Sequence, residues 1–401
     1  MILPRWYIAL GLTLALAGCH ESTGPAPAAA SIDVTPSAAD IPLGGTRQLS
    51  VTVRDAQSRV LNNPAVTFAS TDTTVATVSG TGLLTGRALG FAAVTVTAGA
   101  VAATVSVVVV THPSGTVAGT AAVASRPFAI AISRSGLAYA GRQDLPYLQL
   151  SQLPDAGFGD SVRVGSDPTD IAFTSMGTTA YVTNQFSLNV GVISVGVKRS
   201  VDSIPIPSGN PFRVVVAPDD QYCYVSTSTG MLYEISTVTN TITRQLALSV
   251  SPVNGLAFQP NGDVLYATST GGSLFEITLS TGVVRFAAVG GTLQDIAVSL
   301  DGTELYIANE AGALDVRDAA TGADLTTIPA AANAFALKLS PDGTELYASF
   351  PSSGLVKIID RASRSVVQTL GVGGMPRRIA FSRLGTTALI PNESGFISVI
   401  K

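Results

Sequence analysis

Histidine, tryptophan and cysteine are almost absent from this chain, whose 401 residues include two histidines, one tryptophan and two cysteines. Both histidines, His20 and His112, precede the sequence repeats described below. Nucleophilic triads that depend on a histidine base, and metal sites built on clustered histidines, are therefore excluded from the repeats. Trp6 lies in a segment that we expect to be removed, which leaves no tryptophan to stack on a quinone cofactor, and no cofactor is expected.

Charge is also sparse. Asp, Glu, Lys and Arg make up 12% of the chain, the formal net charge is −4, and no segment forms a basic stripe. Because binding to a nucleic-acid backbone needs clustered Lys and Arg, we exclude nucleic acid as a partner.

The N-terminus has the pattern of a secretory signal peptide, with one positive charge at Arg5 followed by about a dozen apolar residues. This run is too short to span a bilayer, which takes about 20 residues. It ends in Leu-Ala-Gly-Cys19, which resembles the lipobox of bacterial lipoproteins. The resemblance implies that residues 1–18 are cleaved and that Cys19 is lipidated, which would anchor the protein in a membrane. An ordinary signal peptide that happens to contain a cysteine is the alternative. His20 in place of Asp resembles the Gram-negative sorting pattern for the outer membrane, so we expect the bacterial cell envelope.

Two segments follow before the repeats. Residues 19–30 are rich in Pro and Ala and predict a disordered tether. Residues 31–111 have short alternating strands between glycine-containing turns, which predicts a small β-sandwich. Within them, residues 64–78 and the Thr-Gly-Leu-Leu-Thr-Gly that follows resemble the bacterial Ig-like (group 2) domain, with Phe68 where that family usually has Trp. The resemblance implies a spacer at the cell surface, and surface adhesion is the alternative.

After a linker at 112–115, seven repeats at a spacing of 40 to 43 residues occupy most of 116–401. The core of the repeat is an apolar triplet, a turn with Gly and then an aliphatic–Tyr pair. The first residues of the triplets, which we call the anchors, are Ile130, Ile171, Val214, Leu256, Ile296, Leu337 and Ile379. Self-similarity at this period, with short strands inside each repeat, predicts the blades of a β-propeller. The second repeat contains Tyr-Val-Thr-Asn184, and the region resembles the YVTN family of seven-bladed propellers.

The two ends of the repeat region predict how the ring closes. The last repeat stops at its third strand, 396–400, and the missing fourth strand is found at 117–123, which matches 366–372 without a gap. Pairing these ends would leave no open edge. We therefore predict an all-β chain, with a small Ig-like β-sandwich followed by a seven-bladed β-propeller closed by the N-terminal strand of the propeller region.

Two groups of side chains that suggest chemistry have simpler interpretations. Cys223 takes the position filled by Ala180 or Leu265 in other repeats, so a small buried side chain is expected rather than a reactive thiol. Acidic turns such as 219–220 and 301–302 lack the ligand spacing of an EF-hand and stand where Asp and Gly form ordinary turns. We assign no catalytic residue and no metal ligand.

The central channel is the remaining candidate site, because propellers place their first strands around it. The residues just before the anchors should share one level of the channel: Ala129, Asp170, Arg213, Gly255, Asp295, Ala336 and Arg378. Two acids and two arginines at this level could form a polar pocket for a small or zwitterionic ligand, or they could pair with one another in a wet channel. Loops after the second strands should add polar residues at the same mouth: Arg142, Gln143, Asn184, Gln185, Asn309, Glu310, Asn392 and Glu393.

These patterns favour a non-catalytic role, in which the propeller faces bind or scaffold a protein or a small-molecule partner. The alternative is an enzyme. Propellers that resemble this one include sugar lactonases and lyases, and Asp170 or Asp295 would then act with Arg213 or Arg378 as acid and base. The shortage of histidine, the commonest general base near neutral pH, weighs against that alternative.

Overall fold

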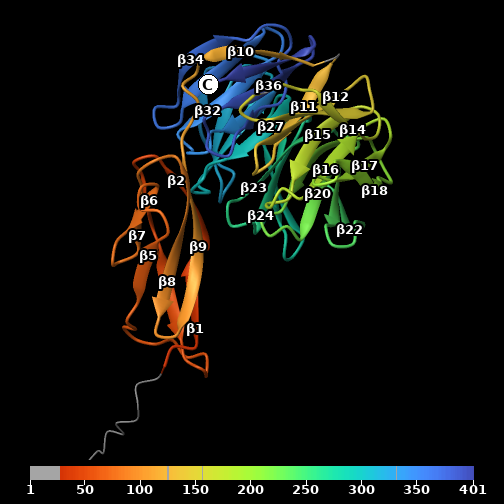
Figure 1. Cartoon of the computed structure of the whole chain (residues 1–401). Helices are drawn as coiled ribbons and strands as arrows, with labels where there is room; N and C mark the ends of the chain where they lie inside the picture. The colour runs from red at the N-terminus through yellow and green to blue at the C-terminus, as the bar shows by residue number, and fades with distance from the viewer. Residues whose placement is uncertain (1–27, 124–125, 156, 331) are drawn as a thin grey trace, which may run out of the picture.

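The computed structural model describes residues 28–123, 126–155, 157–330 and 332–401. The regular elements in these ranges are β-strands, and within them no helix is long and apolar enough to cross a membrane. The expected signal peptide and the lipidation site at Cys19 lie outside the described residues. Figure 1 shows an elongated N-terminal domain, in red and orange, beside a wider C-terminal domain.

The N-terminal domain is the predicted β-sandwich. One sheet has the strand order β2-β9-β8-β5, the other has the order β3-β7-β6, and β1 pairs with β4. The strands are β1 (Ser31–Thr35), β2 (Ala38–Pro42), β3 (Thr46–Gln48), β4 (Ser50–Arg54), β5 (Thr67–Ser70), β6 (Ala76–Val78), β7 (Leu83–Gly86), β8 (Gly90–Ala98) and β9 (Val101–Val110). Val94 and Val96 of β8 are buried and the threonines that alternate with them are not, as expected of a strand with one face on a core. Ile41, Leu84 and Phe68 pack in the same core.

The C-terminal domain is the predicted propeller, with seven four-stranded antiparallel sheets. The blades in chain order are β11 (Pro127–Ile132), β12 (Leu137–Arg142), β13 (Tyr147–Gln152), β14 (Asp160–Arg163); β15 (Pro168–Phe173), β16 (Thr179–Asn184), β17 (Asn189–Ser194), β18 (Arg199–Pro205); β19 (Pro211–Val216), β20 (Tyr222–Thr227), β21 (Met231–Ser236), β22 (Thr241–Ala247); β23 (Val253–Phe258), β24 (Val264–Ser269), β25 (Ser273–Thr278), β26 (Val283–Ala288); β27 (Leu293–Val298), β28 (Glu304–Asn309), β29 (Leu314–Asp318), β30 (Asp324–Ile328); β31 (Ala336–Leu339), β32 (Glu345–Phe350), β33 (Leu355–Asp360), β34 (Ser365–Gly371); and β35 (Ala380–Phe381), β36 (Ala388–Asn392), β37 (Phe396–Ile400) with β10 (Val117–Ala122). The first strands of the first six blades contact one another in succession, and β11 also contacts β35 of the seventh blade. The sixth and seventh blades pack through Tyr347 and Ile379, so the blades form a ring.

The tyrosines of the repeat hold neighbouring blades together. Tyr139, Tyr181, Tyr224, Tyr266, Tyr306 and Tyr347 stand on second strands and are at most 2% exposed. Tyr266, for example, packs with Leu293 and Ile296 of the next blade, and its hydroxyl donates a hydrogen bond to the Ala319 carbonyl at 2.7 Å. A buried phenol with a satisfied hydroxyl stabilises a blade interface through its large apolar ring.

The predicted closure of the ring is confirmed. β10 pairs antiparallel with β37 from Val117 opposite Ile400 to Ala122 opposite Phe396. The pairing is extended by two backbone hydrogen bonds between Thr116 and Lys401, of 2.7 and 2.9 Å. The last blade is therefore completed by the strand that begins the domain, in orange next to blue in Figure 1.

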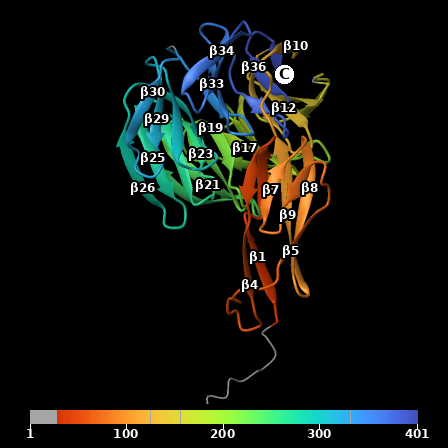
Figure 2. The same ribbon diagram turned by 90° about the vertical axis from the view of Figure 1, so that its left-hand side faces the viewer.

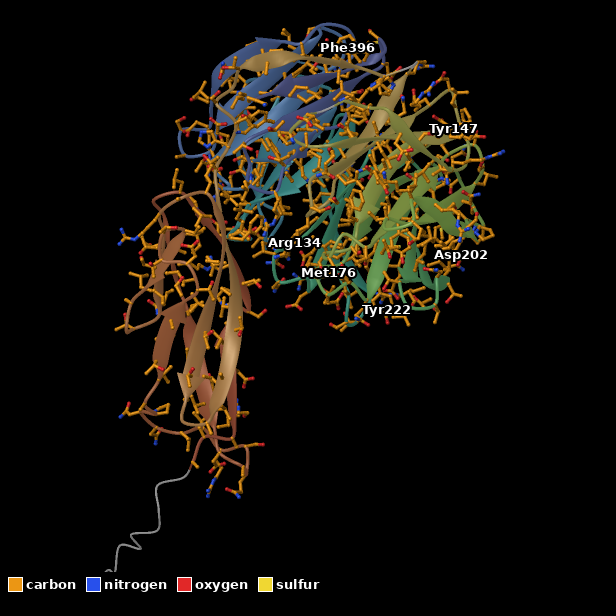
Figure 3. All side chains as sticks on the ribbon, viewed as in Figure 1. Arg134, Tyr147, Met176, Asp202, Tyr222 and Phe396 are labelled. Atoms are coloured by element: carbon orange, nitrogen blue, oxygen red, sulfur yellow. The ribbon has the colours of Figure 1, made fainter. Side chains whose placement is uncertain are left out.

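The two domains meet on one face of the propeller, formed by the turns between the first and second strands of the blades, which we call the turn face. The Thr111 amide donates to the Leu384 carbonyl at 3.0 Å, and Arg383 forms a two-contact ion pair with Asp40 of β2. Figure 2 shows the sandwich extending away from this junction, and Figure 3 places Arg134, from another turn, on the side of the propeller nearest the sandwich.

The segment predicted as a linker, 112–115, is packed on the sixth blade. His112 Nδ1 lies 2.7 Å from a carboxylate oxygen of Asp342, and Pro113 and Gly115 are buried. The Gln368 amide donates to the Gly115 carbonyl at 2.7 Å. These contacts fix the segment on the propeller over its whole length.

Candidate functional site in the propeller channel

The four charged residues predicted at one level of the channel are brought together, and we call them the charged tier. Arg213 lies between the two carboxylates, with Nη1 3.4 Å from Asp170 Oδ2 and Nη2 3.0 Å from Asp295 Oδ1. Arg378 Nη1 lies 3.7 Å from Asp295 Oδ2. Burial acts to lower the pKa of Arg213, but the two carboxylates outweigh it and raise that pKa.

The two carboxylates of the tier also bridge neighbouring blades. Asp170 on β15 accepts a hydrogen bond from the Val214 amide on β19 at 3.0 Å. Asp295 on β27 accepts one from the Leu337 amide on β31 at 3.2 Å, and a second from its own neighbour Ile296 at 3.0 Å. Both side chains are at most 8% exposed. Backbone donors and Arg213 thus hold the carboxylates in fixed positions.

Arg378 is less well satisfied than the rest of the tier. Its side chain is 3% exposed, and within the described residues none of its three guanidinium nitrogens has a hydrogen-bond partner. Burial lowers the pKa of Arg378 to about 10, and the charge of Arg213 acts in the same direction. A buried cation without hydrogen bonds costs free energy unless another group supplies the missing contacts.

One end of the channel is closed by three aromatic rings that the sequence analysis did not identify. Phe128, Phe212 and Phe335 each stand two residues before an anchor, and we call them the phenylalanine plug. Phe128 makes edge contacts with the other two rings at centroid distances of 6.2 and 5.7 Å. The Arg378 guanidinium lies 5.2 to 5.7 Å from all three centroids, and Arg377 also lies over two of the rings. Cation–π attraction thus holds both arginines on the plug.

The plug corrects the prediction of an open mouth at this end. The loop residues expected to enlarge that mouth are largely inside the protein: Arg142, Asn184, Asn309 and Asn392 are at most 8% exposed. Asn392, for example, accepts a hydrogen bond from the Met375 amide at 2.7 Å, so it braces a turn. Glu393 pairs with Arg126 and Arg377. The other four residues of the set, Gln143, Gln185, Glu310 and Glu393, are half-buried.

The cavity instead opens on the turn face. It has a volume of about 780 Å³, and its lining runs from the charged tier to turn residues such as Ser175, Leu300 and Arg383, with Asp40 of the sandwich at the rim. Midway, two residues beyond the tier, small apolar side chains form a sleeve: Ala131, Ala172, Val215, Ala257, Ala297 and Ala380. Because strand side chains alternate, the sleeve points to the channel like the tier.

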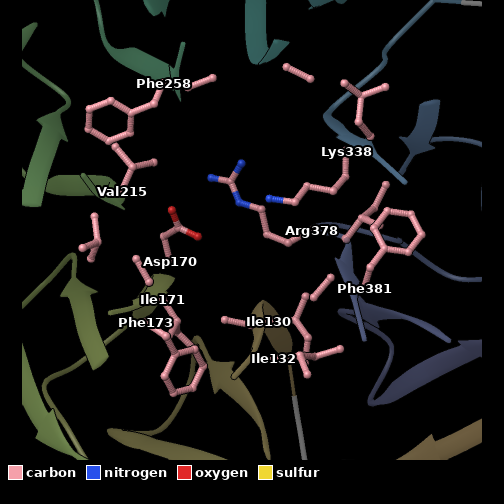
Figure 4. A pocket seen from close by; sticks show the side chains of 18 of the residues that line it. Ile130, Ile132, Asp170, Ile171, Phe173, Val215, Phe258, Lys338, Arg378 and Phe381 are labelled. Atoms are coloured by element: carbon pink, nitrogen blue, oxygen red, sulfur yellow. The ribbon is translucent and has the colours of Figure 1, made fainter. Parts of the chain in front are cut away.

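Lys338 takes the seventh position of the sleeve and is a candidate site residue that sequence reasoning missed. It follows the anchor Leu337, lines the cavity and is exposed to it, and Figure 4 shows its amine reaching the middle of the channel where Arg378 and Asp170 also point. Burial in the surrounding protein lowers the pKa of Lys338, and the charge of Arg213 lowers it further. Its position in the repeat could have identified it, because every other blade has Ala or Val one residue after the anchor.

The cavity is cationic although the chain as a whole is acidic. Five cationic side chains and three carboxylates line it, whereas the full sequence has 23 Lys and Arg against 27 Asp and Glu. At the deep end, Arg213, Lys338 and Arg378 face only Asp170 and Asp295. The described residues contain no group of three or more His, Cys, Asp or Glu side chains that could hold a metal ion. Cys223 is buried away from the channel, and burial raises the pKa of its thiol.

Comparisons with known proteins agree with both domain folds. Residues 28–109 match the family model of the bacterial Ig-like domain (group 2). No curated protein matches the chain. Among solved structures, the hydrazine synthase of Kuenenia stuttgartiensis is similar in fold, with a TM-score of 0.63 and 19% sequence identity, over 73% of this chain and 99% of that one. At this identity the likeness concerns the fold alone.

Proposed function

We propose that this chain is a lipid-anchored, non-catalytic protein of the bacterial cell envelope, and that its ligand or protein partner binds to the propeller. The observation that carries the binding role is the channel, a deep pocket closed at one end by the phenylalanine plug and open at the other. Closed concave sites with an apolar wall and a few polar groups at one end are typical of ligand-binding pockets.

The N-terminal domain acts as a spacer in this proposal. β9, with ten residues, spans roughly 30 Å at about 3.3 Å per residue and leads directly to the propeller junction. β1, the first strand of the described residues, begins at the end of the sandwich opposite this junction (Figure 1). Because the junction is held by Thr111, Arg383 and His112, the spacer would present the propeller in a fixed orientation.

The enzymatic alternative is less well supported by the geometry. An acid or base must reach a reacting group and exchange a proton with it. The Asp170 and Asp295 carboxylates instead accept backbone hydrogen bonds across blade interfaces and pair with Arg213. We therefore expect no turnover of lactones or cyclic esters. Turnover by the wild type that is lost in Asp170→Asn would refute the non-catalytic role.

Anchoring is tested separately. Cells that express the full chain should incorporate labelled palmitate into it, and the protein should sediment with outer membranes. The Cys19→Ser variant should take up no label and leave the membrane fraction. An unlabelled wild-type protein would refute lipidation. Cross-linking in intact cells then asks whether a protein partner contacts the propeller.

A further inference from the structure

We propose that the deep end of the channel binds a small organic monoanion, with a carboxylate headgroup at Lys338 and Arg378 and an apolar body along the sleeve. This inference rests on the proposed binding role of the propeller and adds the chemical class of the ligand. It starts from the two cations that the charged tier leaves without full compensation.

The first step is the inventory of charge. Both tier carboxylates are already engaged by Arg213 and by backbone amides of Val214 and Leu337. Arg378 retains only the 3.7 Å contact to Asp295, and its nitrogens have no hydrogen-bond partner within the described residues. Within the described residues, the Lys338 amine forms no hydrogen bond or ion pair, and it extends into the open cavity. Three cations against two carboxylates leave one positive charge, which a monoanion would neutralise.

The second step is the shape of the headgroup. A guanidinium offers donors in a planar fork that matches the two oxygens of a carboxylate, and an ammonium adds a point charge with rotatable donors. A phosphate monoester carries about −1.5 to −2 charges near pH 7 and would exceed the single excess charge at this level. Arg378 cannot retreat, because the phenylalanine plug lies behind it. Lys338 can move aside, because it is exposed to the cavity.

The third step is the wall between the headgroup and the turn face. Ala131, Ala172, Ala257 and their equivalents supply no charge and no hydrogen-bond donor along the sleeve, and Phe173 and Phe258 lie close by (Figure 4). From Asp170 to Phe173, where the strand ends, the wall covers three residues, about 10 Å. The wall thus favours a hydrocarbon or aromatic body longer than that of acetate.

The experiment uses the full mature chain with Cys19→Ser, so that no lipid or detergent competes. Isothermal titration calorimetry is run with acetate, butanoate, hexanoate and octanoate, and with octylamine and inorganic phosphate for comparison. Burial of each methylene should tighten binding about fourfold. Lys338→Met, which keeps the side-chain length and removes the charge, should weaken octanoate binding about tenfold or more, whereas Lys338→Arg should retain it.

Arg285→Met is the matched control. It removes the same unit of charge from β26, where Arg285 is 70% exposed and does not line the cavity, and it should bind octanoate like the parent. Circular dichroism confirms that each variant is folded. Arg378→Met provides a second test at the deep end and should also lose octanoate affinity.

Several results would overturn the inference: octylamine binding as tightly as octanoate, Lys338→Met binding like the parent, or acetate and inorganic phosphate matching octanoate. Failure of the inference is distinguishable from failure of the proposed function. No carboxylate binding together with a protein cross-linked to the propeller would refute the inference and leave the binding role intact. Octanoate-competitive turnover of an ester would uphold the site and refute the non-catalytic role.

Discussion

Gly385 controls how the sandwich docks on the propeller, and its replacement by alanine is the sharpest test of the domain junction. Gly385 has a φ of +81°, and a Cβ built there would lie 1.8 Å from the Thr111 carbonyl oxygen. That oxygen belongs to the backbone and cannot rotate away, so Gly385→Ala must displace the segment that joins the domains. Displacement breaks the hydrogen bond from Thr111 to Leu384 and the ion pair between Arg383 and Asp40.

The magnitude follows from these contacts. A left-handed alanine costs about 1–2 kcal/mol, the backbone hydrogen bond contributes about 1 kcal/mol, and the partly exposed ion pair adds up to about 1 kcal/mol. Gly385→Ala should therefore weaken docking and stability by about 2–4 kcal/mol in total. Gly262→Ala is the matched control, because Gly262 has the same φ of +81° at the equivalent turn and its Cβ would meet nothing nearer than Pro218 at 3.4 Å. Gly262→Ala should lower the free energy of unfolding by about 1–2 kcal/mol and keep the domains docked.

Docking is read from the distance between spin labels on Phe91 of the sandwich and Val238 of the propeller, which are 51% and 78% exposed. The wild type and Gly262→Ala should give one narrow distance distribution, and Gly385→Ala a broad one. Denaturant unfolding then compares the stabilities of the two variants. Equal distributions and equal stabilities for both would refute the assignment of the junction to Thr111 and Gly385.

Three further predictions follow from the described contacts. Deletion of 116–125 removes the pairing of β10 with β37 and exposes an edge of the last blade, so the thermal unfolding temperature of the whole propeller should fall. An unchanged unfolding temperature would contradict closure of the ring by this strand. Burial raises the pKa of the Cys223 thiol, so in the Cys19→Ser chain a thiol reagent at pH 8 should label Cys223 only after unfolding, and rapid labelling of the folded protein would show that the site is accessible. The pKa of Lys338, which lies among Asp170, Asp295, Arg213 and Arg378, is below its ordinary value of 10.5. Because only the protonated amine attracts an anion, octanoate affinity should fall as pH rises through this lowered pKa. Lys338→Arg should move the fall to higher pH, and an affinity that stays constant up to pH 10.5 would oppose the role of Lys338.

The fold was predictable because the same local pattern recurs in seven successive repeats of the chain. Side-chain alternation, a turn glycine such as Gly302 with φ of +73°, and a buried tyrosine such as Tyr306 all specify the same hairpin. Ring closure was predictable for the same reason, because 117–123 matches a fourth strand. The docked junction was not predictable, because it depends on single contacts between segments far apart in the chain, such as Asp40 with Arg383.

The sequence predicted which residues of the candidate site share one level of the channel, but not the end from which a ligand reaches them. Counting from the anchors placed Asp170, Arg213, Asp295 and Arg378 at one height, because strand side chains repeat every two residues. The same count finds three phenylalanines one residue earlier, but Thr169, Asn254, Gln294 and Arg377 share that level, so the sequence does not say that the rings meet. They meet because Phe128, Phe212 and Phe335 come from the first, third and sixth blades and reach the axis together.

The end at which the channel opens determines which charges a ligand meets. Once the plug closes one end, the only approach to the charged tier within the described cavity is through the sleeve, past Lys338. A cation at that point adds to Arg378 rather than neutralising Asp170 or Asp295, because backbone amides and Arg213 already occupy those carboxylates. The same four tier residues below an open mouth would present a balanced set of charges to solvent. Beneath an apolar sleeve with one lysine, they present an excess of positive charge. The attraction between this charge and an anion is stronger there than in bulk water, because the effective dielectric constant is lower.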